Sequence, residues 1–209
     1  MGKDERVMND GANVGDDAGA RGRGLIVLSG PSGVGKTTVA RAVERELNSV
    51  FSVSATTRPK TAVDVEGRDY FFLSEAEFQD KAERGEMLEH ACVFGKHWYG
   101  TPRGPVEAAL AAGHRVILEI DVQGARQIRD AMPDAVMVFI EPPSEAELLV
   151  RLRNRGREDE AVIQRRFAEA RREIAFAHES GVYDAFVVNQ TLEHAVAETI
   201  EAISTHLGQ

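Results

Sequence analysis

An octapeptide that directly follows a short apolar run constrains this chain more than any other feature. Residues 30–37 read G-P-S-G-V-G-K-T and fit the pattern G-x-x-x-x-G-K-[ST], while residues 25–28 read L-I-V-L. In such a loop the main-chain N–H groups curl around a polyphosphate, Lys36 reaches its β and γ oxygens, and the Thr37 hydroxyl can ligate Mg²⁺. Four consecutive branched apolar residues are typical of a strand buried on both faces of a parallel sheet. The sequence therefore predicts a phosphate-binding loop between a buried strand and a helix.

The helix after this loop is predicted over Thr38–Asn48, where apolar residues recur at helical spacing and charged residues lie between them. The positive end of its dipole favours anions at the loop. A glycine-rich turn that only closes a strand-helix corner is the alternative, but it explains neither Lys36 nor Thr37. The predicted ATP-binding residues of this segment are Gly30, Pro31, Ser32, Gly33, Val34, Gly35, Lys36, Thr37 and Thr38.

Further apolar runs predict the rest of the sheet. They cover residues 51–55, 115–121, 135–141 and 185–189, and helical patterns separate several of them. Ser144 with Glu147 forms a capping box, and Thr191 opens a last amphipathic helix. Such alternation predicts an α/β fold, with a five-stranded parallel core sheet, helices on both faces and ligands at the carboxyl ends of the strands.

The pattern breaks between residues 58 and 113, where an inserted mixed α/β lobe is predicted. Strand-like runs at 69–73 and 87–94 flank a helix that Ser74 caps. Polar side chains of this region fall at predicted strand ends or turns, where they tend to face a cleft. These residues are Ser54, Arg58, Tyr70, Glu89, Tyr99 and Thr101.

Composition bounds the class of protein. The chain has 209 residues, and 43% of them are hydrophobic, which is enough for one domain with a substantial core. No stretch approaches the roughly 20 apolar residues of a membrane span, and no secretory signal is evident, so a soluble, cytoplasmic protein is expected. A formal net charge of −9 argues against nucleic-acid binding. The single cysteine, Cys92, excludes an internal disulfide.

Two segments differ from the rest in composition. Residues 1–22 have few large apolar side chains and no periodicity, so they are predicted to form a disordered tail. Residues 151–172 concentrate positive charge in an otherwise acidic chain. The arginines of this stretch are Arg151, Arg153, Arg155, Arg157, Arg165, Arg166, Arg171 and Arg172.

The ordered series of motifs resembles the guanylate kinase family from about residue 23 to 207. The motifs that carry the resemblance are the octapeptide at 30–37, S-A-T-T-R at 54–58, G-R-D-Y-F-F at 67–72, Y-G-T at 99–101, E-I-D-V-Q-G at 119–124 and R-G at 155–156. The resemblance implies Mg²⁺-dependent transfer of the ATP γ-phosphoryl group to GMP or dGMP, with ATP and the monophosphate as partners. Whether the protein forms homo-oligomers stays open.

The resemblance also implies how guanine is read. Guanine presents an O6 acceptor, an N2 donor and an N1–H donor. Ser54 and Thr101 are expected opposite O6 and Glu89 opposite the N–H groups, with Glu119 or Asp121 assisting. Adenine would leave these groups mispaired, so strong preference for GMP over AMP is expected.

A clamp for the acceptor phosphate is expected from Arg58, Tyr70 and Tyr99. The family usually carries a second arginine three residues after the first and a Gly-Glu pair soon after. This chain instead has Thr61 and Val63-Asp64, and Lys60 is a candidate for the missing charge.

By the same resemblance, Lys36, Arg58, Arg151, Arg155 and Arg166 are the expected catalytic cations. Residues 143–172 would form a lid, 58–113 the GMP-binding lobe, and 23–57, 114–142 and 173–207 the core. The remaining arginines of the 151–172 stretch are expected on solvated helix faces or paired with Glu158, Glu169 and Glu173.

Three polar residues after strands complete the predicted site. The resemblance also implies that Asn189 and Gln190 lie near adenine, although most relatives carry aspartate where Gln190 stands. Asp121 is expected to order water around Mg²⁺, and its alternative role is a helix cap.

Two other functions stay open. One is a P-loop kinase for a different phosphorylated acceptor. The other is a non-catalytic interaction module of guanylate kinase type, although such modules typically lose the loop lysine and glycines that this chain keeps.

Overall fold

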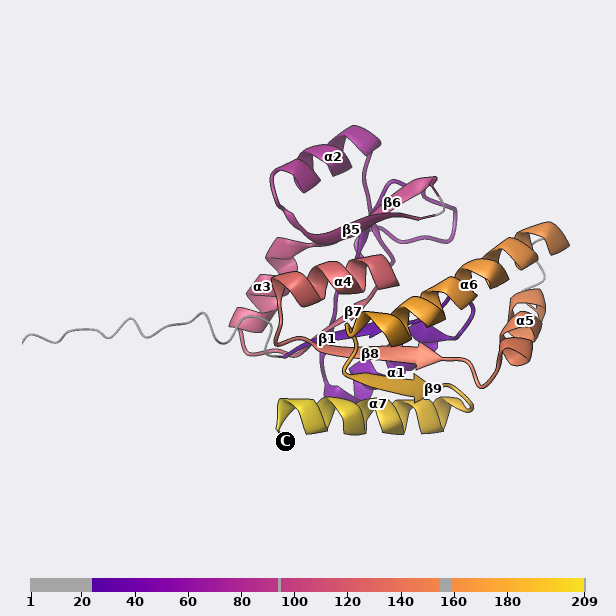
Figure 1. The fold of residues 1–209 in the computed structure, drawn as a ribbon. Coiled ribbons are helices and arrows are strands. Elements are labelled where there is room, and N and C mark those ends of the chain that lie inside the picture. Colours follow the sequence, from indigo (N-terminus) through magenta and orange to yellow (C-terminus); the bar gives the residue numbers. More distant parts are fainter. Residues whose placement is uncertain (1–23, 94, 155–158, 209) are drawn as a thin grey trace, which may run out of the picture.

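A parallel sheet between two layers of helices forms the body of the molecule (Figure 1). The computed structural model describes residues 24–93, 95–154 and 159–208. The predicted disordered tail and Arg155 therefore lie outside the described residues.

Within the described residues the core sheet has five strands in the order β2-β7-β1-β8-β9, and every pairing is parallel. This arrangement confirms the predicted sheet. Its strands are β1 (Leu25–Ser29), β2 (Val50–Phe51), β7 (Val116–Glu119), β8 (Val136–Glu141) and β9 (Ala185–Val188).

Helices cover both faces of this sheet, as its buried strands require. In β1, Ile26 and Leu28 pack into the cluster under α1 and α7, whereas Leu25 and Val27 pack into the cluster under α3, α4 and α6. Figure 1 shows the two layers below and above the sheet. The bounds are α1 (Lys36–Leu47), α3 (Arg103–Ala111), α4 (Val122–Ala131), α6 (Glu160–Ser180) and α7 (Leu192–Leu207).

Helix ends follow the local sequence, with small shifts from the predicted bounds. α1 begins two residues earlier than predicted, at Lys36. Thr191 caps α7 as expected, since its hydroxyl accepts from the His194 N–H at 3.3 Å. The Ser144 hydroxyl accepts from the Glu147 N–H at 3.1 Å at the start of α5 (Glu145–Asn154).

The predicted strand over residues 51–55 is wrong as a single element. It divides into β2, which belongs to the core sheet, and β3 (Ala55–Thr56), which belongs to a second sheet. Ser52–Ser54 carry the chain from one sheet to the other. A run of β-favouring residues does not reveal that its two ends pair with different partners.

The second sheet has the order β4-β3-β6-β5, and its strands come from the predicted lobe except β3, which lies in the segment predicted as core. The elements of the lobe are β4 (Phe71–Phe72), α2 (Glu75–Glu83), β5 (Met87–Val93) and β6 (His97–Pro102). Ser74 and Glu77 form the predicted capping box of α2. Ala55, Phe78 and Met87 form a small core of their own, against which Trp98 packs.

Strand β6 was not predicted, because Gly100 and Pro102 interrupt its β-favouring residues. It pairs with β5 and β3, so Tyr99 and Thr101 lie within a strand and not at a turn. The helix α6 runs unbroken through residue 172, where the lid is predicted to end. The division of the chain into core, lobe and lid stays a prediction.

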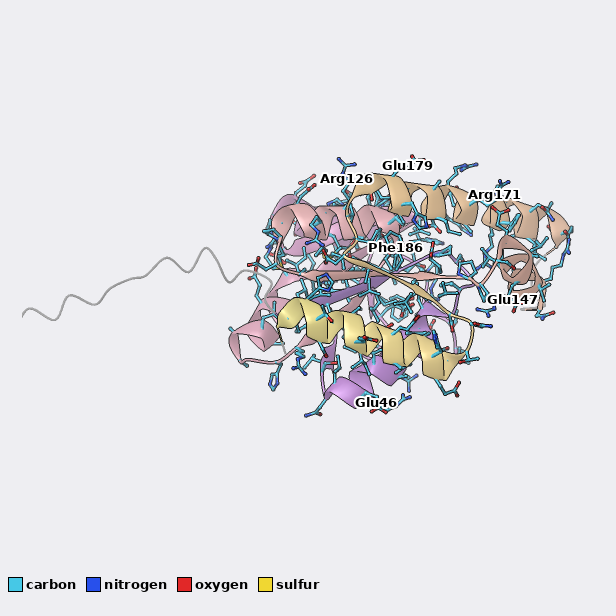
Figure 2. All side chains as sticks on the ribbon, turned by 60° about the horizontal axis from the view of Figure 1, so that its bottom comes forward. Glu46, Arg126, Glu147, Arg171, Glu179 and Phe186 are labelled. Atoms are coloured by element: carbon cyan, nitrogen blue, oxygen red, sulfur yellow. The ribbon has the colours of Figure 1, made fainter. Side chains whose placement is uncertain are left out.

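The outer surfaces of the helical layers are charged. Arg126 of α4 and Glu179 of α6 point away from the sheet (Figure 2). Among the described helices, none is both long and apolar enough to cross a bilayer.

Candidate active site

A cavity of about 710 Å³ opens at the carboxyl ends of β1 and β7, between the loop at 30–37, the lobe and α6. Residues that were predicted for two different nucleotides meet in it. From the predicted ATP site it is lined by Gly30, Ser32, Lys36 and Thr37. From the predicted GMP site it is lined by Ser54, Tyr70, Glu89, Tyr99, Glu119 and Asp121.

The loop at 30–37 is held by main-chain contacts. A Cβ atom at Gly30 would collide with the Ile140 carbonyl oxygen of the neighbouring strand, so this close approach requires glycine. The Lys36 Nζ donates to the Gly30 carbonyl at 2.5 Å and to the Pro31 carbonyl at 3.3 Å. Lys36 therefore lies over the loop, where it can meet the oxygens of a bound polyphosphate.

Two predicted residues support the loop from its outer side. The Asn189 Nδ2 donates to the Val34 carbonyl at 2.7 Å, and the Arg151 Nη2 donates to the Asn189 carbonyl at 3.0 Å. With Thr38 they line a second cavity of about 380 Å³. Gln190 is exposed and is not among the residues that line either cavity, so the structure brings only Asn189 of this pair to the loop.

Helix α6 closes the cavity from the opposite side. The Arg166 Nη2 donates to the Ser32 hydroxyl at 2.5 Å, which places this predicted cation at the loop. Glu173, two turns further along α6, is largely buried, and desolvation raises its pKa to about 7 although the charge of Lys36 opposes the shift. Its Oε2 has no hydrogen-bond partner within the described residues.

Sequence reasoning missed the position of Glu173 in the cavity, because Glu173 was expected to pair with an arginine of the 151–172 stretch. The signal that could have found it is the seven-residue spacing from Arg166, which puts both side chains on one face of α6. Arg153, Arg171 and Arg172 are exposed, as predicted, but among the described residues Glu169 is the one predicted partner that pairs with an arginine, and Glu158 lies outside those residues. Exposed ion pairs join Arg153 to Glu160, Arg171 to Glu145 and Arg172 to Glu169.

Glu89 of β5 is 4% exposed and lines the cavity. The Thr101 hydroxyl donates to its Oε1 at 2.7 Å. Burial raises the pKa of Glu89 to about 7, against the hydrogen bond from Thr101 and with a smaller contribution from Asp121. A Cβ atom at Gly124 would collide with the Glu89 Oε2, so α4 leaves room for the carboxyl only because glycine stands there.

The prediction for Thr101 changes with this geometry. Thr101 is 1% exposed and is not among the lining residues. Its hydroxyl donates to Glu89 and does not face the cavity, where guanine O6 was expected. β-strand alternation puts Thr101 and Tyr99 on the same face of β6, but only Tyr99 reaches the cavity. The sequence could not show whether Glu89 would accept a hydrogen bond from the Thr101 hydroxyl or from the Tyr99 hydroxyl.

The Arg58 guanidinium lies beside the cavity and not among its lining residues. Its Nη1 and Nη2 each donate to a different oxygen of Asp64 at 3.0 Å. It also lies 5.3 Å from the ring centroid of Tyr70, whose ring centroid is 5.8 Å from that of Tyr99. The predicted clamp residues are therefore neighbours, but the arginine is paired with a carboxylate of its own loop.

The side chains near the loop could supply the few protein oxygens that Mg²⁺ needs when substrate phosphates also coordinate it. The Thr37 hydroxyl donates to the Glu119 Oε1 at 2.7 Å, and Asp121 lines the same cavity. In the described residues no group of three or more His, Cys, Asp or Glu forms a metal cluster. Mg²⁺ commonly takes one or two protein oxygens and completes its shell with water and substrate phosphates.

Asp121 also has the alternative role that its position suggested. Strand β7 ends at Glu119, two residues before the predicted end, and Asp121 is the N-cap of α4. Its Oδ1 accepts from the N–H groups of Gln123 and Gly124, both at 2.9 Å.

A phosphate-binding loop that opens a helix at the carboxyl edge of a parallel sheet, facing a polar pocket from an inserted lobe, defines a P-loop α/β nucleotide-binding protein. Comparison with known proteins narrows this class. The guanylate kinase family profile matches residues 22–206. The chain belongs to the guanylate kinase family.

Individual relatives agree with this assignment. A guanylate kinase of Gloeobacter violaceus is 49% identical over 192 residues, which cover 91% of each chain. One from Thermosynechococcus vestitus is 48% identical and covers 86% of this chain and 92% of its own. The crystal structure of guanylate kinase from Anaplasma phagocytophilum is 32% identical, has a TM-score of 0.70 and covers 91% of this chain and 88% of its own.

Proposed function

We propose that this protein catalyses the reversible transfer of the γ-phosphoryl group of ATP to GMP or dGMP, giving ADP and GDP or dGDP. The observation that carries the proposal is the shared cavity, in which the loop around Lys36 faces the pocket of Glu89. Membership of the guanylate kinase family and relatives that bear this name support it.

Glu89 is the proposed reader of guanine. Its ionised carboxylate would accept hydrogen bonds from the N1–H and N2–H groups, and the Ser54 hydroxyl would donate to O6. Thr101 would hold Glu89 in place through the 2.7 Å hydrogen bond. AMP lacks this complementarity, and a site built on hydrogen bonds rejects a mismatched partner by roughly 10⁴-fold or more.

The loop is the proposed site of the ATP phosphates. Its N–H groups and Lys36 would hold the β and γ phosphates, and Asn189 would support the loop near the adenine. Mg²⁺ would neutralise phosphate charge when it is bound. Thr37 would hold it, with Glu119 and Asp121 close enough to order its water ligands.

The reaction needs no general base from the protein. The second pKa of a phosphate monoester is about 6, so the attacking oxygen of GMP is already ionised near neutral pH. The chain therefore has to align donor and acceptor, exclude water and neutralise charge. We assign the neutralising role to Lys36, Arg58, Arg151, Arg155 and Arg166. Of these, Lys36, Arg151 and Arg166 contact the loop.

Closure of residues 143–172 over the nucleotides would exclude water from the γ-phosphate. Arg151 donates to the Val34 carbonyl of the loop and Arg166 to the Ser32 hydroxyl, so closure of this segment would bring both charges to the phosphates. ATP hydrolysis without GMP should then be slow.

A coupled ADP-release assay with ATP and Mg²⁺ tests the proposal against GMP, dGMP, AMP, CMP and UMP. We expect turnover with the two guanine nucleotides only. Turnover with another phosphorylated acceptor, and none with GMP, would indicate a different P-loop kinase. Binding of GMP without turnover would indicate an interaction module.

A further inference from the structure

Arg58 and Asp64 form a bidentate pair beside the cavity. The guanidinium nitrogens Nη1 and Nη2 each donate to one carboxylate oxygen at 3.0 Å, and the two side chains are 25% and 13% exposed. An arginine grips a phosphate with the same two parallel hydrogen bonds. Asp64 therefore occupies the donors that an acceptor phosphate would use.

The loop keeps Asp64 in place for this contact. Its Oδ2 accepts from the Thr61 N–H at 2.7 Å and from the Thr61 hydroxyl at 2.6 Å. The hydrogen bonds from Arg58 and then from Thr61 hold the pKa of Asp64 well below its usual range. Asp64 is therefore ionised at every pH at which the protein would work.

The ion pair with Asp64 holds the Arg58 guanidinium next to the cavity, but Arg58 is not among the residues that line it. Tyr70 lines the cavity, and the Arg58 Cζ lies 5.3 Å from the centroid of its ring and 5.4 Å from that of Phe72. The Lys60 Nζ lies 5.8 Å from the centroid of the same Phe72 ring. A phosphate between Tyr70 and Tyr99 would thus meet Arg58 only if the guanidinium left Asp64 or shared its donors.

We propose that Asp64 is an intramolecular competitor of the acceptor phosphate and sets the affinity for GMP by holding Arg58. This inference rests on the proposed function, because it assigns the phosphate of that reaction to Arg58. When only a fraction of the molecules has Arg58 available, the apparent dissociation constant rises by the inverse of that fraction. Weakening the pair should therefore tighten GMP binding.

The test is the isosteric variant Asp64→Asn, which removes the charge and one acceptor from the pair. We expect the KM and the calorimetric dissociation constant for GMP to fall about twofold to fivefold, as for a partly exposed ion pair. The KM for ATP should not change, and kcat should change less than the KM for GMP.

Binding of guanosine distinguishes the contribution of the phosphate to affinity from that of the base. It carries no phosphate, so its affinity should be the same in wild type and Asp64→Asn. Asp80→Asn is the matched control, since it removes a carboxylate from the same lobe where Asp80 pairs with exposed Arg84 at 2.7 Å. This control should leave GMP binding unchanged.

Thr61→Val provides a second test if Asp64→Asn lowers the melting temperature. It removes the 2.6 Å hydroxyl contact but keeps the charge of Asp64, so GMP binding should tighten by a smaller factor. Unchanged or weaker GMP binding in both variants would overturn the inference, as would an equal change in guanosine binding. Failure of wild type to phosphorylate GMP would instead overturn the proposed function, and the binding measurements would still decide the role of Asp64.

Discussion

The two sides of the cavity are built in different ways. The loop at 30–37 presents main-chain groups, and contacts from neighbouring strands fix it, such as the hydrogen bond from Asn189 to the Val34 carbonyl. The lobe presents side chains, and these pair with one another: Thr101 with Glu89, and Arg58 with Asp64. The main-chain N–H groups of the loop keep their positions when no ligand is bound. The side chains of the lobe instead form hydrogen bonds with one another, which a ligand would have to replace.

This difference predicts where substitutions act. On the loop side, removal of Lys36, the cation that lies over the loop, should lower turnover most. On the lobe side, the partners of the binding residues should matter as much as the binding residues themselves.

Replacing Lys36 with alanine is the strongest test of the loop side. We expect kcat to fall about 10⁴-fold, because the charge on the transferred phosphoryl group loses its fixed neutralising partner. The ADP-release assay measures this effect, and circular dichroism should show an unchanged fold. Lys81→Ala is the matched control, since Lys81 pairs with exposed Glu86 on the lobe surface. Wild-type turnover of the Lys36 variant would refute the role of this lysine.

Replacing Glu89 with glutamine tests the lobe side. The amide keeps the shape and the contact with Thr101, but it presents a donor to the N–H groups of guanine. We expect kcat/KM for GMP to fall about 10²-fold to 10³-fold, while the KM for ATP stays within a factor of two. Glu86→Gln is the control for an exposed carboxylate of the same lobe. Equal effects on both nucleotides would show that the guanine pocket lies elsewhere.

The pH dependence of stability tests whether burial of Glu89 is costly. Its pKa is raised from 4.5 to about 7 in the folded protein. Between these values the folded state holds a proton that the unfolded state has released, so stability falls as pH rises through this window and levels off above it. From pH 5.5 to 7.5, wild type should lose on the order of 2 kcal/mol relative to Glu89→Gln.

Chemical denaturation of both proteins at several pH values measures this difference. Glu173, whose pKa is also raised to about 7, is present in both proteins and cancels. Parallel curves for wild type and Glu89→Gln would contradict the assigned burial cost.

Replacing Gly124 with alanine gives the smallest expected effect and tests the contact between lobe and core. The new Cβ would displace the Glu89 carboxyl. We expect the KM for GMP to rise about fivefold. The free energy of unfolding should change little, because the higher helix propensity of alanine, about 1 kcal/mol over glycine, offsets the cost of moving the carboxyl. Gly104→Ala in α3 is the control, since open space surrounds its Cβ position. An unchanged KM for GMP would show that Glu89 can shift without loss.

The sequence predicted more of the core than of the lobe. The loop motif and the buried runs at 25–28 and 135–141 are local patterns, and their strands were found. The lobe depends on pairing between distant residues, so β6 was missed and the run at 51–55 was assigned to one strand. Glu173 was missed because helical spacing shows which residues share a face but not what that face meets.

The sequence by itself determined the phosphate-binding loop, the parallel sheet and the family, because each depends on residue types at short, fixed spacings. Tertiary structure decided which side chains meet: Glu89 with Thr101 under Gly124, and Arg58 with Asp64 beside the cavity. The hydrogen bonds and desolvation that set these contacts depend on distances of a few ångströms between separate strands and loops. Residue types and their spacing along the chain do not reveal these distances, because the contacting residues are far apart in the sequence.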